Sequence, residues 1–303
     1  MDVINLLDGN FFGTSSSVPG RSPKNFKWSR GNAGWDNLTV FTDSNIGWCK
    51  KVESPKKLLW IMEPRAIWAT YDPNLKQFNE AFEIEDESLL GIITHDEEML
   101  NKYPDKTFKS VVGGCWVNDF CEYKLDGSGI NRHIIADEPL HNISTMISHK
   151  DAVGGHVLRH QVVNEFPSPG TWGNEYLDSF GTGVGKFLNY KEPALTPYLF
   201  HIAIENSQTI NYFTEKLIDA LVTSTVPIYW GCPNISDYFN IEGFITFNTM
   251  EELKDIVYDI KNNARDIYAS KEEAIRENFK LAQNYLCTED WLYDNIIKEI
   301  LHA

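Results

Sequence analysis

The clearest pattern of apolar and polar positions lies in residues 199–230. In its first part apolar side chains recur at every second position, which predicts a strand that ends at Glu205 and Asn206. A polar loop follows, in which Asn211 is a suitable N-cap for a helix. That helix would place five side chains on one face: Phe213, Leu217, Ala220, Leu221 and Ser224. Residues 225–230 then form a second strand, so the segment predicts one βαβ crossover with parallel strands.

A similar pattern occupies residues 143–166. An alternating strand is followed by a loop that ends in Gly154 and Gly155, and then by apolar positions at helical spacing, including Leu158 and Val162. This order of strand, glycine loop and helix predicts a βα unit, so both segments indicate an α/β fold.

The region before residue 137 is less regular, with short apolar runs between turns that contain Pro, Asn and Asp. The runs at 57–62 and 89–94 are typical of buried strands. A polar segment rich in turn residues, at 123–142, separates this region from the βα units, and we place a domain boundary near residue 137. The tail after about residue 250 is predicted to be helical, with an apolar stripe at its end.

Composition and charge narrow the class of protein. The chain has 303 residues, 42% of them hydrophobic, which suits a folded protein of one large or two medium domains. The formal net charge is −16, so we expect no binding to nucleic acid, which requires an extended basic face. The five cysteines form no CxxC pair, and we expect reduced thiols in a cytoplasmic protein. Neither an export signal nor an integral membrane segment is predicted.

Two groups of residues are candidates for chemistry. Glu205 and Asn206 would lie at the carboxyl edge of a parallel sheet, where open α/β folds bind ligands, and Glu215 and Lys216 would lie in the first turn of the adjoining helix. An acid there can bind ribose hydroxyls, while a lysine and a helix N-terminus bind phosphate charge. A charge pair that only stabilises the helix is an equally good interpretation of these residues.

The second group is Lys150 and Arg159, which flank the Gly154-Gly155 loop. Glycines at a helix entry allow an anion to approach the backbone N–H groups, and the two cations could add fixed positive charge. The alternative is a tight turn with a solvated arginine, which the residues alone favour.

The stretch "IENSQTINYFTEKLIDA…TVPIYWG" resembles the donor-site motif of the α-1,3-fucosyltransferases, glycosyltransferase family 10. The spacing from Glu205-Asn206-Ser207 to Tyr212 and to Thr214-Glu215-Lys216 agrees with that motif without a gap. The runs "MISHKDAVGGHVLRHQV" and "KEPALTPYLF" resemble the family more weakly.

The resemblance implies an α/β fold of GT-B type, with two Rossmann-like domains facing an interdomain cleft. The N-terminal domain, 1–137, would bind the acceptor glycan, and the C-terminal domain, 138–303, would bind the donor, GDP-fucose. The last helix, about 289–303, could pack back on the N-terminal domain. The reaction would be inverting, without a cofactor and without a metal in the site. No D-x-D triplet occurs in the chain.

The resemblance also implies roles for single residues. Glu215 would bind the ribose, Lys216 and Arg159 the pyrophosphate, and Asn206 and Tyr212 the phosphate and sugar end. Glu205 and Lys150 complete the predicted donor site.

The catalytic base is predicted from a shorter match. An inverting transfer needs a base for the acceptor hydroxyl, and Glu63 directly follows the apolar run 57–62. Asp96 and Glu97, which follow the run 89–94, could serve instead.

Two further alternatives stay open at this point. The donor could be another nucleotide sugar, or the chain could be a non-catalytic α/β protein that binds nucleotides. Six of the nine tryptophans are in the first 120 residues, where one or two could stack on an acceptor sugar while the rest belong to the core.

Overall fold

The computed structural model describes residues 1–9, 14–31, 37–117, 141–166 and 177–302. The chain divides into two compact units. The first comprises Met1–Gly114, Thr209–Tyr212 and Cys287–Ala303, and the second comprises Cys115–Gln208 and Phe213–Leu286.

The first unit is a parallel sheet of six strands in the order β2-β1-β3-β4-β5-β6. Its strands are β1 (Asp2–Leu7), β2 (Phe26–Ser29), β3 (Thr39–Thr42), β4 (Lys57–Trp60), β5 (Leu89–Thr94) and β6 (Thr107–Lys109). Its helices are the 3-10 helix η1 (Asp43–Lys50), α1 (Arg65–Tyr71), α2 (Lys76–Phe82), α3 (Glu97–Lys102), α8 (Thr288–Leu292), the π-helix η7 (Tyr293–Ile297) and α9 (Lys298–His302). The runs 57–62 and 89–94, predicted as buried strands, contain β4 and β5.

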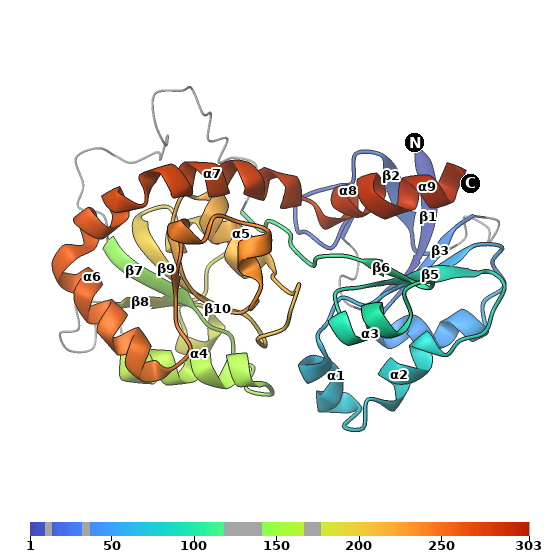
Figure 1. Cartoon of the computed structure of the whole chain (residues 1–303), viewed down its shortest axis with the longest axis horizontal. Coiled ribbons are helices and arrows are strands. Elements are labelled where there is room, and N and C mark those ends of the chain that lie inside the picture. Colours follow the sequence, from blue (N-terminus) through green and yellow to red (C-terminus); the bar gives the residue numbers. More distant parts are fainter. Residues whose placement is uncertain (10–13, 32–36, 118–140, 167–176, 303) are drawn as a thin grey trace. The chain divides into compact units, whose positions relative to one another are not determined.

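Both faces of this sheet are covered, because successive side chains of a strand point to opposite sides. Leu58 and Trp60 of β4 join one buried cluster, and Leu59 joins another. The first cluster is completed by Leu292, Ile296 and Ile297 from the C-terminal segment, and the second by residues of η1, α1, α2 and α3. Figure 1 shows α8 and α9 on one side of these strands and α1 to α3 on the other.

The second unit is a parallel sheet of five strands in the order β11-β10-β9-β7-β8. Its strands are β7 (His141–Met146), β8 (Leu177–Phe180), β9 (Tyr198–Ile204), β10 (Val226–Trp230) and β11 (Ile245–Thr246). Its α-helices are α4 (Gly154–Glu165), α5 (Glu215–Val222), α6 (Met250–Ser270) and α7 (Glu272–Ala282). Short 3-10 helices are η2 (Thr182–Val184), η3 (Glu192–Ala194), η4 (Ile235–Asp237), η5 (Ile241–Gly243) and η6 (Gln283–Tyr285).

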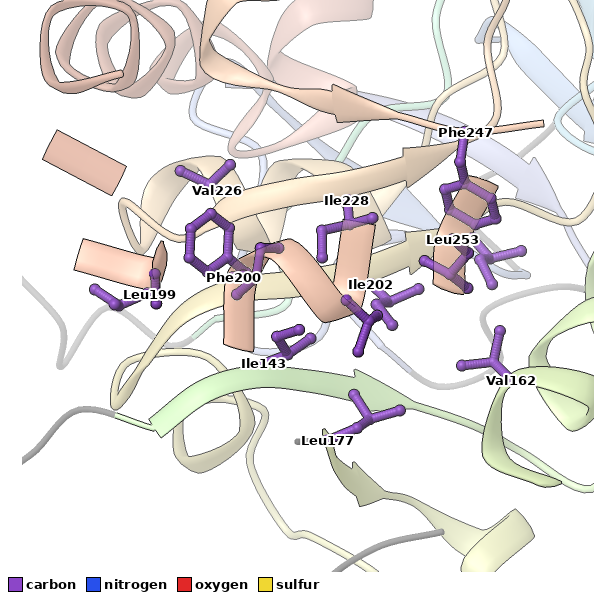
Figure 2. Packing of buried hydrophobic residues seen from close by; sticks show 14 of the residues in the cluster. Ile143, Val162, Leu177, Leu199, Phe200, Ile202, Val226, Ile228, Phe247 and Leu253 are labelled. Atoms are coloured by element: carbon purple, nitrogen blue, oxygen red, sulfur yellow. The ribbon is translucent and has the colours of Figure 1, made fainter. Parts of the chain in front are cut away.

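One face of this sheet carries the main core of the unit. Phe200 and Ile202 of β9 and Ile228 of β10 point to this face and pack with Val162 of α4 and Leu253 of α6 (Figure 2). Helix α5 contacts β9 and β10 but contributes no residue to this cluster, and α5 and α6 lie on opposite sides of the two strands (Figure 1). The predicted crossover is confirmed, since β9 and β10 pair in parallel.

The predicted start of α5 is wrong. The N-cap is Thr214, whose hydroxyl accepts a hydrogen bond from the Lys216 N–H, and not Asn211. Asn211 has a left-handed backbone, with a φ of 62°, and its side-chain Nδ2 donates to the Glu97 carboxylate at 2.9 Å. Its amide therefore serves a contact within the first unit instead of capping the helix.

The domain boundary near residue 137 and the turn-rich segment before it lie largely outside the described residues. By its contacts, the chain passes from the first unit to the second between Gly114 and Cys115. The C-terminal segment from Cys287 onward belongs to the first unit. Within the described part of the chain, no helix is long and apolar enough to cross a membrane.

Candidate functional site

Most of the predicted donor residues lie at the carboxyl edge of the second sheet, where β9 ends beside the N-termini of α4 and α5. Glu205 directly follows β9 and is fully buried. Its carboxylate accepts hydrogen bonds from the Thr214 N–H at 2.8 Å and from the Thr214 hydroxyl at 2.7 Å. Burial raises the pKa of Glu205. Glu205 thus holds the first turn of α5 against the end of β9.

Glu215 and Lys216 begin α5, as predicted, and both are partly buried. The Lys216 Nζ lies 3.2 Å from a Glu215 carboxylate oxygen and 3.7 Å from one of Glu205. Burial raises the pKa of Glu215, but Lys216 and Lys191 oppose this effect and bring it down to about 2. Glu215 is therefore an ionised acceptor at neutral pH.

Lys191 joins Glu205, Glu215 and Lys216 in one charged cluster, and the sequence did not single it out. Its Nζ lies 2.6 Å from Asp219 of α5 and 3.7 Å from Glu215. Asp219 is also almost completely buried, with an exposed fraction of 2%. An acid inside the otherwise apolar helix run "LIDALV" was the available signal, because a buried charge needs a partner. The sequence does not say which residue that partner is.

Arg159 and Asn206 meet at the same edge, from α4 and from the end of β9. The Arg159 guanidinium donates to the Ile204 carbonyl oxygen at 2.6 Å and 3.0 Å and to the Asn206 side-chain oxygen at 3.0 Å. Arg159 is 7% exposed, so it is not the solvated helix residue that the alternative interpretation required.

The two glycines at the start of α4 have different surroundings. A Cβ on Gly155 would lie 1.8 Å from the Glu205 carbonyl oxygen, whereas a Cβ on Gly154 would have no atom within 4 Å. Gly155 is required for the close approach of α4 to the end of β9. Gly154 leaves open space at the helix N-terminus, as the phosphate interpretation requires.

Lys150 is exposed in the loop before α4, and its carbonyl oxygen lies 3.0 Å from the His160 ring.

His156, a second residue missed by the sequence analysis, is buried in the first turn of α4 and forms a hydrogen bond with the Asn206 side chain. Burial, together with the charges of Arg159, Lys150 and Lys216, lowers its pKa to about 4. His156 is therefore neutral in an otherwise cationic environment.

Tyr212 does not join this cluster. It belongs to the Thr209–Tyr212 segment of the first unit, is 2% exposed, and its ring lies 5.0 Å from the ring of His95.

The structure places Glu63, the predicted base, between β4 and α1, and it is half-buried. The Glu63 N–H donates to the carboxylate of Asp43 at 3.2 Å. The alternative acids have other partners: Asp96 caps α3 and pairs with Arg65 at 2.6 Å, and Glu97 accepts the Asn211 hydrogen bond. Within the described residues, no group of three or more His, Cys, Asp or Glu side chains is arranged to hold a metal ion.

Comparison with known proteins finds a family model that matches the region containing α5. Residues 172–291 match the family model described as glycosyltransferase family 10 (fucosyltransferase), C-terminal. An alpha-(1,3)-fucosyltransferase of Helicobacter pylori is 29% identical over 134 residues, which is 44% of this chain and 26% of that protein. An alpha-(1,4)-fucosyltransferase of Arabidopsis thaliana is 38% identical over 71 residues, or 22% of this chain and 18% of that protein. The match thus spans about a quarter of these relatives or less.

Solved structures of other proteins share the fold of this chain over most of its length. A crystal structure of an alpha1,3-fucosyltransferase aligns with a TM-score of 0.54 at 16% identity, covering 91% of this chain and 80% of that one. A structure of an alpha1,3-fucosyltransferase with GDP aligns with a TM-score of 0.51 at 15% identity, covering 94% and 89%. The chain therefore has an α/β fold of GT-B type, and its residues 172–291 are similar to the C-terminal domain of glycosyltransferase family 10.

Proposed function

We propose that this chain is an inverting fucosyltransferase, which transfers L-fucose from GDP-fucose to a hydroxyl group of a glycan. The observation that carries the proposal is the charged cluster of Glu205, Glu215, Lys216 and Lys191, because it lies within the region that matches the fucosyltransferase family. A protein of similar fold was solved with GDP, which supports the choice of nucleotide.

In this proposal the residues of the second unit bind the donor. Ionised Glu215 accepts hydrogen bonds from ribose hydroxyls, and Lys216, Arg159 and Lys150 provide positive charge for the pyrophosphate. The N-terminus of α4 adds backbone N–H groups beside Gly154. These cations stabilise the departing GDP without a bound metal.

The chemical step exchanges one bond for another. The acceptor hydroxyl oxygen bonds to the anomeric carbon, the bond from that carbon to the phosphate oxygen breaks, and GDP leaves with the bonding electrons. Glu63 takes the proton of the acceptor hydroxyl as general base. In this proposal the first unit, which carries Glu63, binds the acceptor.

The donor half of the proposal is tested by calorimetry in the presence of EDTA. GDP should bind, and it should bind more tightly than UDP or CMP. Lys216→Ala should weaken GDP binding by about tenfold or more, because a hydrogen bond to a charged group contributes roughly 1.5–3 kcal/mol. Lys280→Ala, which removes an exposed lysine of α7 in the same unit, is the control and should leave the affinity unchanged.

The catalytic half is tested by transfer of fucose to a working acceptor. Glu63→Gln should lower turnover by about 10²–10⁴-fold with GDP affinity preserved, whereas Glu97→Gln should retain most activity. Loss of activity in Glu97→Gln alone would move the base to that residue. GDP binding without transfer or hydrolysis of GDP-fucose by the parent would favour a non-catalytic nucleotide-binding protein.

A further inference from the structure

Trp116 presents an exposed aromatic ring next to α5. Its side chain is 40% exposed, whereas Trp60 and Trp68 of the first unit are fully buried. The Trp116 ring is therefore accessible to a ligand at the surface of the second unit.

The backbone of Trp116 is fixed independently of its ring. The buried Asp219 carboxylate accepts hydrogen bonds from the Trp116 N–H at 2.6 Å and from the Val117 N–H at 3.3 Å. Its other oxygen binds the Lys191 ammonium. The backbone of Trp116 is therefore held beside α5 by Asp219, and these hydrogen bonds do not use the indole ring.

The Lys191 ammonium connects this ring to the candidate donor site. It lies 4.6 Å from the centroid of the Trp116 ring and 3.7 Å from the Glu215 carboxylate. Glu215 is the residue that the proposed function assigns to the ribose. One ammonium thus contacts both an aromatic ring and the acid that would bind the sugar to which a nucleobase is attached.

We propose that Trp116 is the stacking surface for the base of the bound nucleotide, a purine. The inference rests on the proposed function, because it takes Glu215 as the ribose ligand. Stacking of a base on an aromatic side chain contributes about 1–3 kcal/mol and depends on the π-face of the base more than on its hydrogen-bonding groups. Trp116 therefore adds affinity for the nucleoside part of the donor, while Lys216 and Arg159 act on its phosphates.

The test compares a ligand that contains a base with one that lacks it. Trp116→Ala should weaken GDP binding by about 5- to 100-fold in calorimetry and leave the binding of inorganic pyrophosphate unchanged. Trp116→Phe retains an aromatic face and should stay within a few-fold of the parent. Trp48→Ala is the matched control, since Trp48 is 50% exposed in the first unit and has the Lys51 ammonium 4.8 Å from its ring centroid.

Three results would overturn the inference. Unchanged GDP affinity in Trp116→Ala would remove the ring from the site. An equal loss for GDP and pyrophosphate would show that the ring acts through Lys191. An increase in the acceptor KM with unchanged GDP affinity would make Trp116 a platform for the acceptor sugar. If the parent itself does not bind GDP, the proposed function fails first, and the two failures are thereby distinguished.

Discussion

Gly154 and Gly155 are adjacent at the N-terminus of α4, but their surroundings differ. One glycine allows close packing of the backbone, and the other leaves space at the helix N-terminus. Gly155 packs against the backbone of Glu205 and Asn206, and its own N–H donates to the Asn206 carbonyl oxygen at 3.1 Å. Gly154 faces open space. Of the two, only Gly155 is required for the packing of α4 on the end of β9.

Alanine substitutions should therefore have different effects at the two positions. Gly155→Ala should reduce the free energy of unfolding by about 1–3 kcal/mol or more, because the new Cβ overlaps backbone atoms that cannot move aside. Gly154→Ala should be close to neutral, since helix propensity favours alanine and no atom obstructs the Cβ. Urea unfolding of both variants measures the difference. Equal stability of the two would contradict the close approach of α4 to β9.

At the scale of elements, α5 is held at its N-terminus by charge and along its length by apolar packing. Leu217, Ile218 and Leu221 are buried in apolar surroundings. The carboxylate of Asp219, in the same helix, accepts hydrogen bonds from the Lys191 ammonium and from the backbone N–H of Trp116. Burial alone would lower the pKa of Lys191, but Asp219 and Glu215 raise it above its ordinary value. The Lys191 ammonium consequently remains charged and forms the ion pair that the buried Asp219 carboxylate needs.

Removing Asp219 from its ion pair with Lys191 should strongly reduce the stability of the fold. Asp219→Ala leaves a partly buried ammonium and two backbone N–H groups without their acceptor, so we expect a loss of about 3–5 kcal/mol in the free energy of unfolding. Glu272→Ala provides the comparison, because it breaks the exposed pair with Arg276 one helical turn away in α7 and should cost at most about 0.5 kcal/mol. Chemical denaturation is the measurement, and a similar small cost in both variants would show that Lys191 finds another partner.

At the scale of the whole molecule, both units bury histidines. Burial lowers the pKa of His95 in the first unit and of His156 in the second to about 4, and that of His201 to about 3. His201 is held in β9 by the Ser144 hydroxyl at 2.7 Å. Each of these rings is neutral in the folded chain at neutral pH.

This arrangement predicts that acid destabilises the protein. Between about pH 6.5 and pH 4 the unfolded chain binds protons that the folded chain does not, so stability falls as the pH falls through this window. Each buried histidine contributes a slope of roughly 1.4 kcal/mol per pH unit there. The melting temperature should therefore drop between pH 7 and pH 5, and less steeply in His201→Asn, which has one such group fewer.

The exposed His149 provides the control for this measurement, and His149→Gln should follow the parent's curve. If the melting temperature of His201→Asn falls from pH 7 to pH 5 as steeply as that of the parent, the buried His201 ring does not contribute to the acid destabilisation.

The sequence by itself determined the local architecture of the second unit. The βαβ crossover of β9, α5 and β10, and the βα unit of β7 and α4, follow from periodicity, which depends only on neighbouring residues and the geometry of helices and strands. The match to the fucosyltransferase family is likewise a local pattern around Glu205 and Lys216.

Tertiary structure alone decided the long-range pairings. A contact forms between residues that are close in space, and their separation along the sequence does not show which residues those are. Asn211 donates to Glu97 instead of capping α5, Lys191 pairs with an acid 28 positions away, and Trp116 is fixed by that same Asp219. The C-terminal segment completes the core of the first unit because its apolar stripe covers a face of that sheet. A stripe shows that a helix needs an apolar partner, and only the folded chain determines which surface that partner is.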